Sequence, residues 1–397
     1  MMTRLGLAVA AVFLASALHA KETGLTGPSS TAADLTPGDG LASPEPRTDF
    51  PRNVLPGFYA WKDGLAERGV NLGFDYLALG QWSNSDVGSG EAAGGIARVF
   101  GTIAFGQSAH SLTFKIENRH DLDNRVAPQS FGFDSGALSI TGTAFSDAGT
   151  LLTNLFWTYR DPEGRFTLQA GQIDVTDFLD VYGLVSPYTA FQNLAFNTNP
   201  AINTPNQGVG AAAGVRLSSN FFAIGSIADA NADPSDPNLD VFDTGETFKS
   251  LEIGYTSGLD RIYFDNIHVT LWQSDADGDG TRKGDRGAAF SAAWFFGNQW
   301  MPFVRYGVSD GDAALYEQSL STGLGWYGRN TDLAGVGLNW AKAKGFDDTQ
   351  FTAEAFYRFS VSPALQITPS VQFISDPLLT DSDENIAIFG LRGRVLF

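Results

Sequence analysis

The chain has 397 residues, carries a formal net charge of −19 and contains no cysteine. Disulfide bonds and cysteine-based metal or redox chemistry are therefore excluded, and nucleic-acid binding is disfavoured because it needs a basic surface. The 45 glycines and 31 phenylalanines, set against 3 methionines, favour many twisted strands and tight turns over a helical enzyme. The mean hydropathy of −0.08 is that of a soluble protein, but strands that alternate lipid-facing and water-facing residues average to the same value.

Residues 1–20 are typical of an export signal, with Arg4 before a short apolar run and small residues after it. Cleavage is expected after Ala17 or Ala20. The apolar run is too short for a transmembrane helix, and no stretch of eighteen apolar residues follows, so membrane insertion would require a β-barrel. Residues 21–57 are rich in Pro, Gly, Ser and Thr and predict a flexible leader.

Residues 58–69 predict a short helix at the periplasmic mouth, because Phe58, Trp61 and Leu65 recur at helical spacing and Gly69 follows. A simple linker turn is the alternative. From Val70 the period changes to two, and we predict a barrel domain over residues 70–397. After a first strand that ends before the polar stretch 81–95, the predicted strands are 96–106, 111–119, 151–160, 165–172, 208–217, 221–228, 246–257, 261–273, 286–296, 300–308, 316–327, 333–341, 350–359, 365–374 and 385–397, sixteen in all.

The final strand indicates which solvents the sheet faces. Phe397, Leu391 and Phe389 fall on one face, whereas Arg394 and Arg392 fall on the other. Segments of about ten residues with this alternation, separated by turns, are the signature of an outer-membrane barrel with lipid outside and water inside. We therefore expect outer-membrane lipid around the barrel and recognition of the strand ending in Phe397 by the barrel-assembly machinery.

The connections between predicted strands alternate in length, as expected for short periplasmic turns and longer outer loops. The long ones include residues 120–150, 173–207 and 229–245. Most of the negative charge lies in such loops: the segment 229–245 carries five aspartates and no Lys or Arg.

Charged and aromatic residues predicted inside the barrel form the candidate site. If the apolar phase of each strand faces lipid, the inward charges have mixed signs and would set up a transverse field across the pore; they are Asp75, Arg98, Lys115, Glu117, Arg119, Arg160, Arg305, Glu354 and Arg358. The alternative is that they only hold the wall together by ion pairs. The aromatic segment Ile173–Gln207 is expected to fold into the barrel and narrow it, with Phe178, Phe191, Asn193 and Phe196 at the constriction. It could instead pack against a neighbouring subunit.

Other motifs carry little chemistry. Asp275-Ala-Asp277-Gly-Asp279-Gly280 resembles the start of a calcium loop, but Arg286 stands where the bidentate Glu is needed, so we expect an ordinary acidic loop. No nucleophile elbow, zinc-type His pair or phosphate loop is present, and of the four histidines only His268 has a phase that could face the lumen. The sequence predicts no enzyme, no metal and no cofactor.

Three blocks of residues, in order along the chain, resemble the carbohydrate-selective (OprB-type) porins of Gram-negative outer membranes. The first comprises Trp61, Leu65, Glu67, Gly69, Gly73-Phe74-Asp75-Tyr76 and Gly94-Gly95. The second comprises Gly171-Gln172-Ile173-Asp174, Asp177-Phe178, Phe191, Asn193, Phe196, Pro200, Pro205 and Gly208. The third comprises Glu354, Phe356, Tyr357, Pro369, Gln372, Ser375-Asp376-Pro377 and Gly390-Leu391-Arg392.

The resemblance implies a sixteen-stranded outer-membrane barrel through which mono- or oligosaccharides diffuse passively. The family's usual Lys is replaced here by Gln172, which alters the charge balance near the constriction. Because the chain is acidic overall, neutral sugars are better candidates than sugar acids. Two alternatives remain open: a general or cation-preferring porin on the same fold, and a secreted β-rich binding protein. A homo-oligomer is among the expected assemblies.

Overall fold

The structure is a computed structural model that describes residues 24–36, 52, 54–106, 108–123, 125–278, 280, 283–310, 313–362, 364–380 and 385–397. The predicted signal peptide lies outside the described residues. No described helix is long and apolar enough to cross a membrane.

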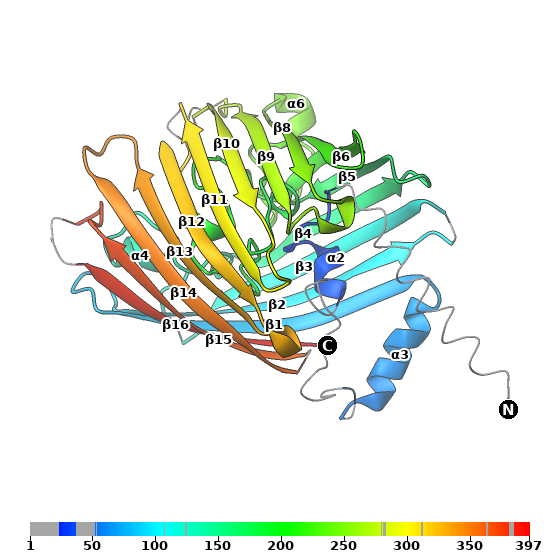
Figure 1. Cartoon of the computed structure of the whole chain (residues 1–397), viewed down its shortest axis with the longest axis horizontal. Helices are drawn as coiled ribbons and strands as arrows, with labels where there is room; N and C mark the ends of the chain where they lie inside the picture. The colour runs from blue at the N-terminus through cyan, green and yellow to red at the C-terminus, as the bar shows by residue number, and fades with distance from the viewer. Residues whose placement is uncertain are drawn as a thin grey trace.

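Sixteen antiparallel strands form one closed barrel, in which each strand pairs with its neighbours in sequence and β1 closes on β16 (Figure 1). The strands are β1 (Val70–Ser83), β2 (Glu91–Ala104), β3 (His110–Asp121), β4 (Gly149–Arg160), β5 (Phe166–Ile173), β6 (Gly208–Arg216), β7 (Phe221–Asp229), β8 (Thr247–Thr256), β9 (Asn266–Ser274), β10 (Asp285–Ala293), β11 (Trp300–Ser309), β12 (Gln318–Tyr327), β13 (Leu333–Lys342), β14 (Thr349–Ser362), β15 (Leu365–Ser375) and β16 (Ile386–Leu396). The predicted fold class and the predicted number of strands are confirmed.

The period-two pattern explains the wall, because alternate side chains of a strand point to opposite faces. Leu271, Val371 and Phe389 keep about half of their surface exposed on the outside (54%, 49% and 51%), whereas Arg392 and Arg394 are buried inside. A row of exposed apolar side chains around a closed sheet is the surface expected to face hydrocarbon.

Two predicted boundaries are wrong. The polar stretch 81–95 was expected to be a loop, but β1 continues to Ser83 and β2 begins at Glu91, because the small and polar side chains there occupy the inward face. A strand was expected from Arg261, but Leu259–Arg261 forms the 3₁₀ turn η2 and β9 begins only at Asn266. The strand with the weakest sequence pattern, 316–327, is present as β12.

Few helices accompany the barrel. The helix α3 (Pro56–Ala66) has proline at its start, ends just before Gly69 at φ +83°, and brings Phe58 to 6.2 Å from Phe74 of β1, between ring centroids. One-turn helices α4 (Phe131–Asp134), α5 (Leu194–Asn197) and α6 (Val241–Thr244) lie in the longer loops, and η3 (Arg329–Thr331) lies in a short turn. The helix α2 (Thr31–Leu35) belongs to the leader and lies inside the barrel (Figure 1).

Candidate functional site

The segment between β5 and β6, residues 174–207, folds into the barrel and is mostly buried there. We call it the inner segment. It contains the 3₁₀ turn η1 (Val175–Asp177) and α5, and each of these short helices is capped by the side chain that precedes it, Asp174 or Asn193. The predicted inward course of this segment therefore agrees with the structure, and the connection fills much of the lumen.

Charged side chains from the wall hold the backbone of the inner segment. Glu354 of β14 accepts hydrogen bonds from the N–H groups of Gln192 (2.8 Å) and Asn193 (2.9 Å). Arg392 of β16 donates to the carbonyl oxygens of Pro187 (2.6 Å) and Ala190 (2.9 Å). Hydrogen bonds to ionised groups are stronger than neutral ones, so this part of the segment is fixed at several points.

Arg305 of β11 makes the equivalent contacts farther along. Its guanidinium donates to the carbonyl oxygen of Thr198 (2.7 Å) and to the carboxylate of Asp180 (2.6 Å), and it lies 4.9 Å from the ring centre of Tyr182. Asp180 also contacts His268 of β9 at 2.8 Å. Burial opposes ionisation of Asp180, but Arg305 and His268 outweigh it, so the pKa of this carboxyl lies below its usual range.

A second charged group lines β1, β2 and β3. Asp75, Arg98 and Glu117 lie side by side on these strands, since Asp75 pairs with Arg98 and Arg98 with Glu117 in the strand register. Arg119 donates to Glu117 at 2.8 Å, and Arg98 stacks on the ring of Tyr188 at 3.8 Å. Burial, aided by the Glu117 charge, raises the pKa of Tyr188 to about 12, so its hydroxyl remains a donor to Glu117.

Lys115 links this group to the inner segment. Its ammonium lies 4.0 Å from the carboxylate of Asp177, which also accepts a hydrogen bond from Asn154 at 3.2 Å. Burial raises the pKa of Asp177 to about 7, although Lys115 acts in the opposite direction. Asp177 therefore titrates close to neutral pH at the place where the inner segment meets the wall.

Aromatic rings of the inner segment pack against the wall rather than facing open space. Phe191 lies 4.8 Å from Phe196 and 4.9 Å from Phe356, between ring centroids, and both Phe191 and Phe196 are fully buried. Phe178 is buried in another apolar cluster with Leu25 of the leader. Asn193 donates to Ser139 and Gln372 and so joins the inner segment to a second loop and to β15.

A second connection, between β3 and β4, also folds inward. The carbonyl oxygen of Thr141 accepts hydrogen bonds from Gln81 (2.8 Å) and Gln372 (2.7 Å), and Phe131 and Phe145 are fully buried. These contacts explain why Leu77 and Leu79 of β1 can point inward, since they meet protein there and not water.

Most predicted site residues meet in the lumen. Arg358 donates to the carbonyl oxygens of Thr189 and Thr331, and it is buried like the other wall charges described above. Arg160 does not join them: it is the last residue of β4, half-buried beside the short turn to β5. Sequence reasoning missed the contribution of Asp34, Asp180 and Glu252. The Glu252 carboxylate accepts hydrogen bonds from the N–H of Asp180 and from the hydroxyl of Thr270, at 2.9 Å each. A signal for Glu252 exists in the sequence, because it lies in the inward phase of β8.

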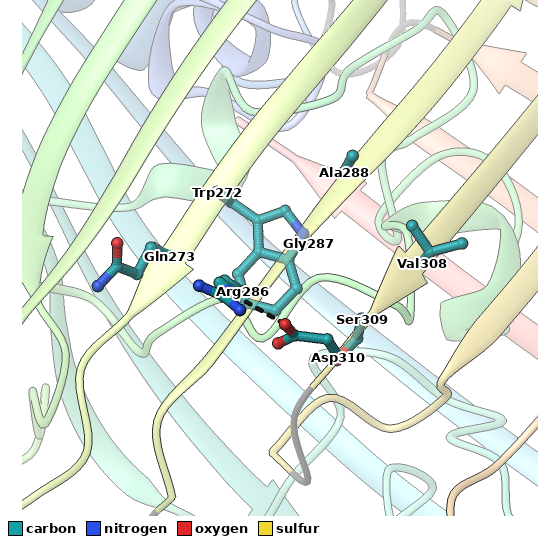
Figure 2. A pocket seen from close by; sticks show the side chains of 8 residues that line it. All are labelled: Trp272, Gln273, Arg286, Gly287, Ala288, Val308, Ser309 and Asp310. Atoms are coloured by element: carbon teal, nitrogen blue, oxygen red, sulfur yellow. Dashed lines mark hydrogen bonds and ion pairs between the residues drawn. The ribbon is translucent and has the colours of Figure 1, made fainter.

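The structure describes only part of the acidic loop at residues 275–286. Within the described residues no group of three or more metal-binding side chains is present. Asp275 accepts hydrogen bonds from Thr247 and Lys249, whereas Asp279 lies outside the described part of the chain. Nearby, a hollow on the outer side of β9, β10 and β11 holds an exposed Arg286–Asp310 ion pair (Figure 2). It lies across the wall from the lumen, because Gln273, Arg286 and Asp310 belong to the outward phase.

Comparison with known proteins agrees with this architecture. Residues 261–397 match the family model described as "Carbohydrate-selective porin, OprB family". The match covers the last 137 of the 397 residues, so the C-terminal third of the chain resembles this family. No curated protein matches the chain. The chain also resembles the high-pH structure of Pseudomonas putida OprB, with 14% identity, a TM-score of 0.66, and coverage of 89% of this chain and 99% of that one.

Other outer-membrane barrels are similar at a lower level. An anion-selective porin from Comamonas acidovorans matches with 11% identity and a TM-score of 0.54, covering 83% of this chain and 99% of that one. A loop-deletion mutant of Vibrio cholerae OmpT matches with 12% identity and a TM-score of 0.51, at the same coverage of each chain. These likenesses show the fold, a closed β-barrel of the kind found in outer-membrane porins.

Proposed function

We propose that this chain is an outer-membrane porin that admits small neutral carbohydrates passively, and that they bind weakly where the inner segment meets the charged wall. The observation that carries the proposal is the contact, inside the barrel, between the charged wall and the aromatic inner segment. Fixed carboxylates and guanidinium groups of β1 to β3 lie beside the inner segment, with Tyr188 between them. Sugar hydroxyls bind such donors and acceptors, and aromatic rings stack on the apolar face of a sugar ring.

The buried side chains of the barrel wall carry charges of both signs. Arg98, Lys115, Arg305, Arg358 and Arg392 lie inside together with Asp75, Glu117, Glu252 and Glu354. Donors and acceptors of both kinds are thus available to the hydroxyl groups of a neutral solute, which supports a sugar as the substrate.

Assembly in the membrane is part of the proposal. We infer that the barrel-assembly machinery recognises the terminal strand ending in Phe397, and that lipid surrounds the outward apolar face. Trp300, Trp326 and Tyr357 lie next to one another on the outward face of β11, β12 and β14, with ring centroids 6.5 Å and 6.3 Å apart. Such a cluster is typical of the aromatic girdle at a membrane interface. A homo-oligomer is a further expectation of the same kind.

Sugar block of ion current tests the function directly. Purified protein in a planar bilayer should open in discrete steps, and glucose should reduce the current saturably, with maltose and glucuronate as comparisons. Current steps whose size neither glucose nor maltose reduces would instead support a general porin.

A further inference from the structure

Part of the N-terminal leader lies inside the barrel. Leu25 and Thr31 are almost fully buried, and α2 lies against β1, β2 and β3 (Figure 1). The leader was expected to be flexible from its composition, and nothing in its sequence pattern indicates a position in the lumen. In the structure, residues 24–36 occupy space through which a solute would have to pass.

The first half of this stretch binds the inner segment. The N–H of Gly27 donates to the carbonyl oxygen of Asp177 at 2.8 Å, and Ser29 donates to the carbonyl oxygen of Thr176 at 3.3 Å. A Cβ at position 27 would lie 2.3 Å from the oxygen of Asp177, so only glycine allows this approach. Leu25 packs with Phe178 and Ile224 in an apolar cluster.

The second half ends in a buried ion-pair cluster. The Asp34 carboxylate accepts hydrogen bonds from Arg98 (3.2 Å) and Arg394 (2.8 Å), and its other oxygen lies 3.0 Å from Arg98. Asp75 of β1 accepts from the same two arginines at 2.8 Å each. Two carboxylates thus balance two guanidinium groups, and all four side chains are nearly inaccessible, at 0–6% exposed.

The two carboxylates differ in how they are held. Asp75 is part of the wall and cannot leave without breaking β1. Asp34 is supplied by a segment that forms no strand pair with the barrel, so the leader can withdraw while every strand pair stays intact. Withdrawal would leave two buried arginines with one carboxylate, and an unbalanced buried charge is strongly unfavourable. A second anion of the same shape would remove that penalty.

We propose that Arg98 and Arg394 form a carboxylate-binding site in the lumen, that Asp34 fills it as a displaceable plug, and that a sugar acid takes its place. This inference rests on the proposed function, because a solute must enter the lumen to reach the site. The planar fork of each arginine matches a carboxylate with two hydrogen bonds. A neutral sugar offers no charge and does not compete for the two arginines.

The test compares wild type with Asp34→Asn in planar bilayers at about 0.1 M salt, where buried pairs are little screened. Glucuronate and glucose serve as a matched pair, because they differ by one carboxylate. We expect Asp34→Asn to conduct more than wild type and to be blocked by glucuronate at about tenfold lower concentration, with glucose block unchanged. Asp63→Asn is the control, since Asp63 pairs with Arg52 on the outside and is half exposed.

Equal conductance and equal glucuronate block in wild type and Asp34→Asn would overturn the inference. Glucose block of wild type tests the proposed function separately, because it does not depend on Asp34. Labelling provides a second readout that leaves the ion pairs intact. The natural chain has no cysteine, so Ser29→Cys, at a position 8% exposed, reports the leader alone. Glucuronate, and not glucose, should speed its reaction with a membrane-impermeant maleimide several-fold; equal rates would contradict displacement.

Discussion

Replacing Glu354 by Gln should release the inner segment from the wall. The carboxylate accepts from two adjacent N–H groups, of Gln192 and Asn193, with each of its oxygens used once. An amide of the same shape keeps one acceptor and sets an N–H₂ group against the other donor. A hydrogen bond to a charged group is worth about 1.5–3 kcal/mol, so the variant should lose about 2 kcal/mol of local anchoring.

A loss of about 2 kcal/mol corresponds to roughly a thirtyfold increase in the equilibrium constant for local opening. Amide hydrogen exchange measures that constant, because the two N–H groups exchange only when the segment opens. We expect exchange at Gln192 and Asn193 to accelerate by about this factor, and single-channel current to become noisier as the segment moves.

The matched control is Glu317→Gln. It removes the same charge from the chain, but Glu317 lies at the rim, where it pairs with Lys342 at 3.5 Å and does not touch the inner segment. If Glu354→Gln and Glu317→Gln gave the same exchange rates at Gln192 and Asn193, the anchoring role assigned to Glu354 would be refuted.

Three further changes test other parts of the structure. Phe397→Ser should impair barrel assembly, seen as loss of heat-modifiable migration in gels; normal migration would count against the terminal-strand argument. Removing the buried rings of Phe191 and Phe196 together should loosen the segment and raise the glucose concentration needed for block several-fold, whereas unchanged block would place the constriction elsewhere. Because the pKa of Asp177 is raised to about 7, the folded state binds one proton more than the unfolded state, and the free energy of unfolding of wild type should fall as pH rises from about 4 to 7. Urea unfolding of Asp177→Asn should lack most of this pH dependence. An equal pH dependence in both proteins would argue against a buried acid there.

The barrel could be predicted from sequence because its signal is local. Alternation such as Leu391-Arg392 and Val395-Arg394 assigns each side chain to lipid or lumen, and turn residues mark the ends of strands. The inward direction of Asp75, Arg98 and Glu354 follows from the same period. Strand boundaries were predicted wrongly where the inward-facing side chains are small or polar, as in the stretch 81–95.

The segments that fill the lumen could not be predicted from this local pattern. Which segment fills a barrel depends on contacts between residues far apart in sequence, such as Asp34 with Arg394 or Asp180 with Arg305. The leader has the composition of a flexible tail, and its position in the lumen depends on contacts with distant residues, such as the backbone approach at Gly27 and the carboxylate of Asp34. The rings of Phe191 and Phe196 suggested a stacking surface for sugars, but aromatic content alone does not distinguish a lining from a packed core.

The most direct test of a sugar channel is the single-channel current of the wild-type protein in a planar bilayer while glucose is added. The account predicts discrete openings whose current falls saturably with glucose concentration, as expected for binding at a constriction. Openings that glucose leaves unchanged, or a folded protein that gives no openings, would contradict it.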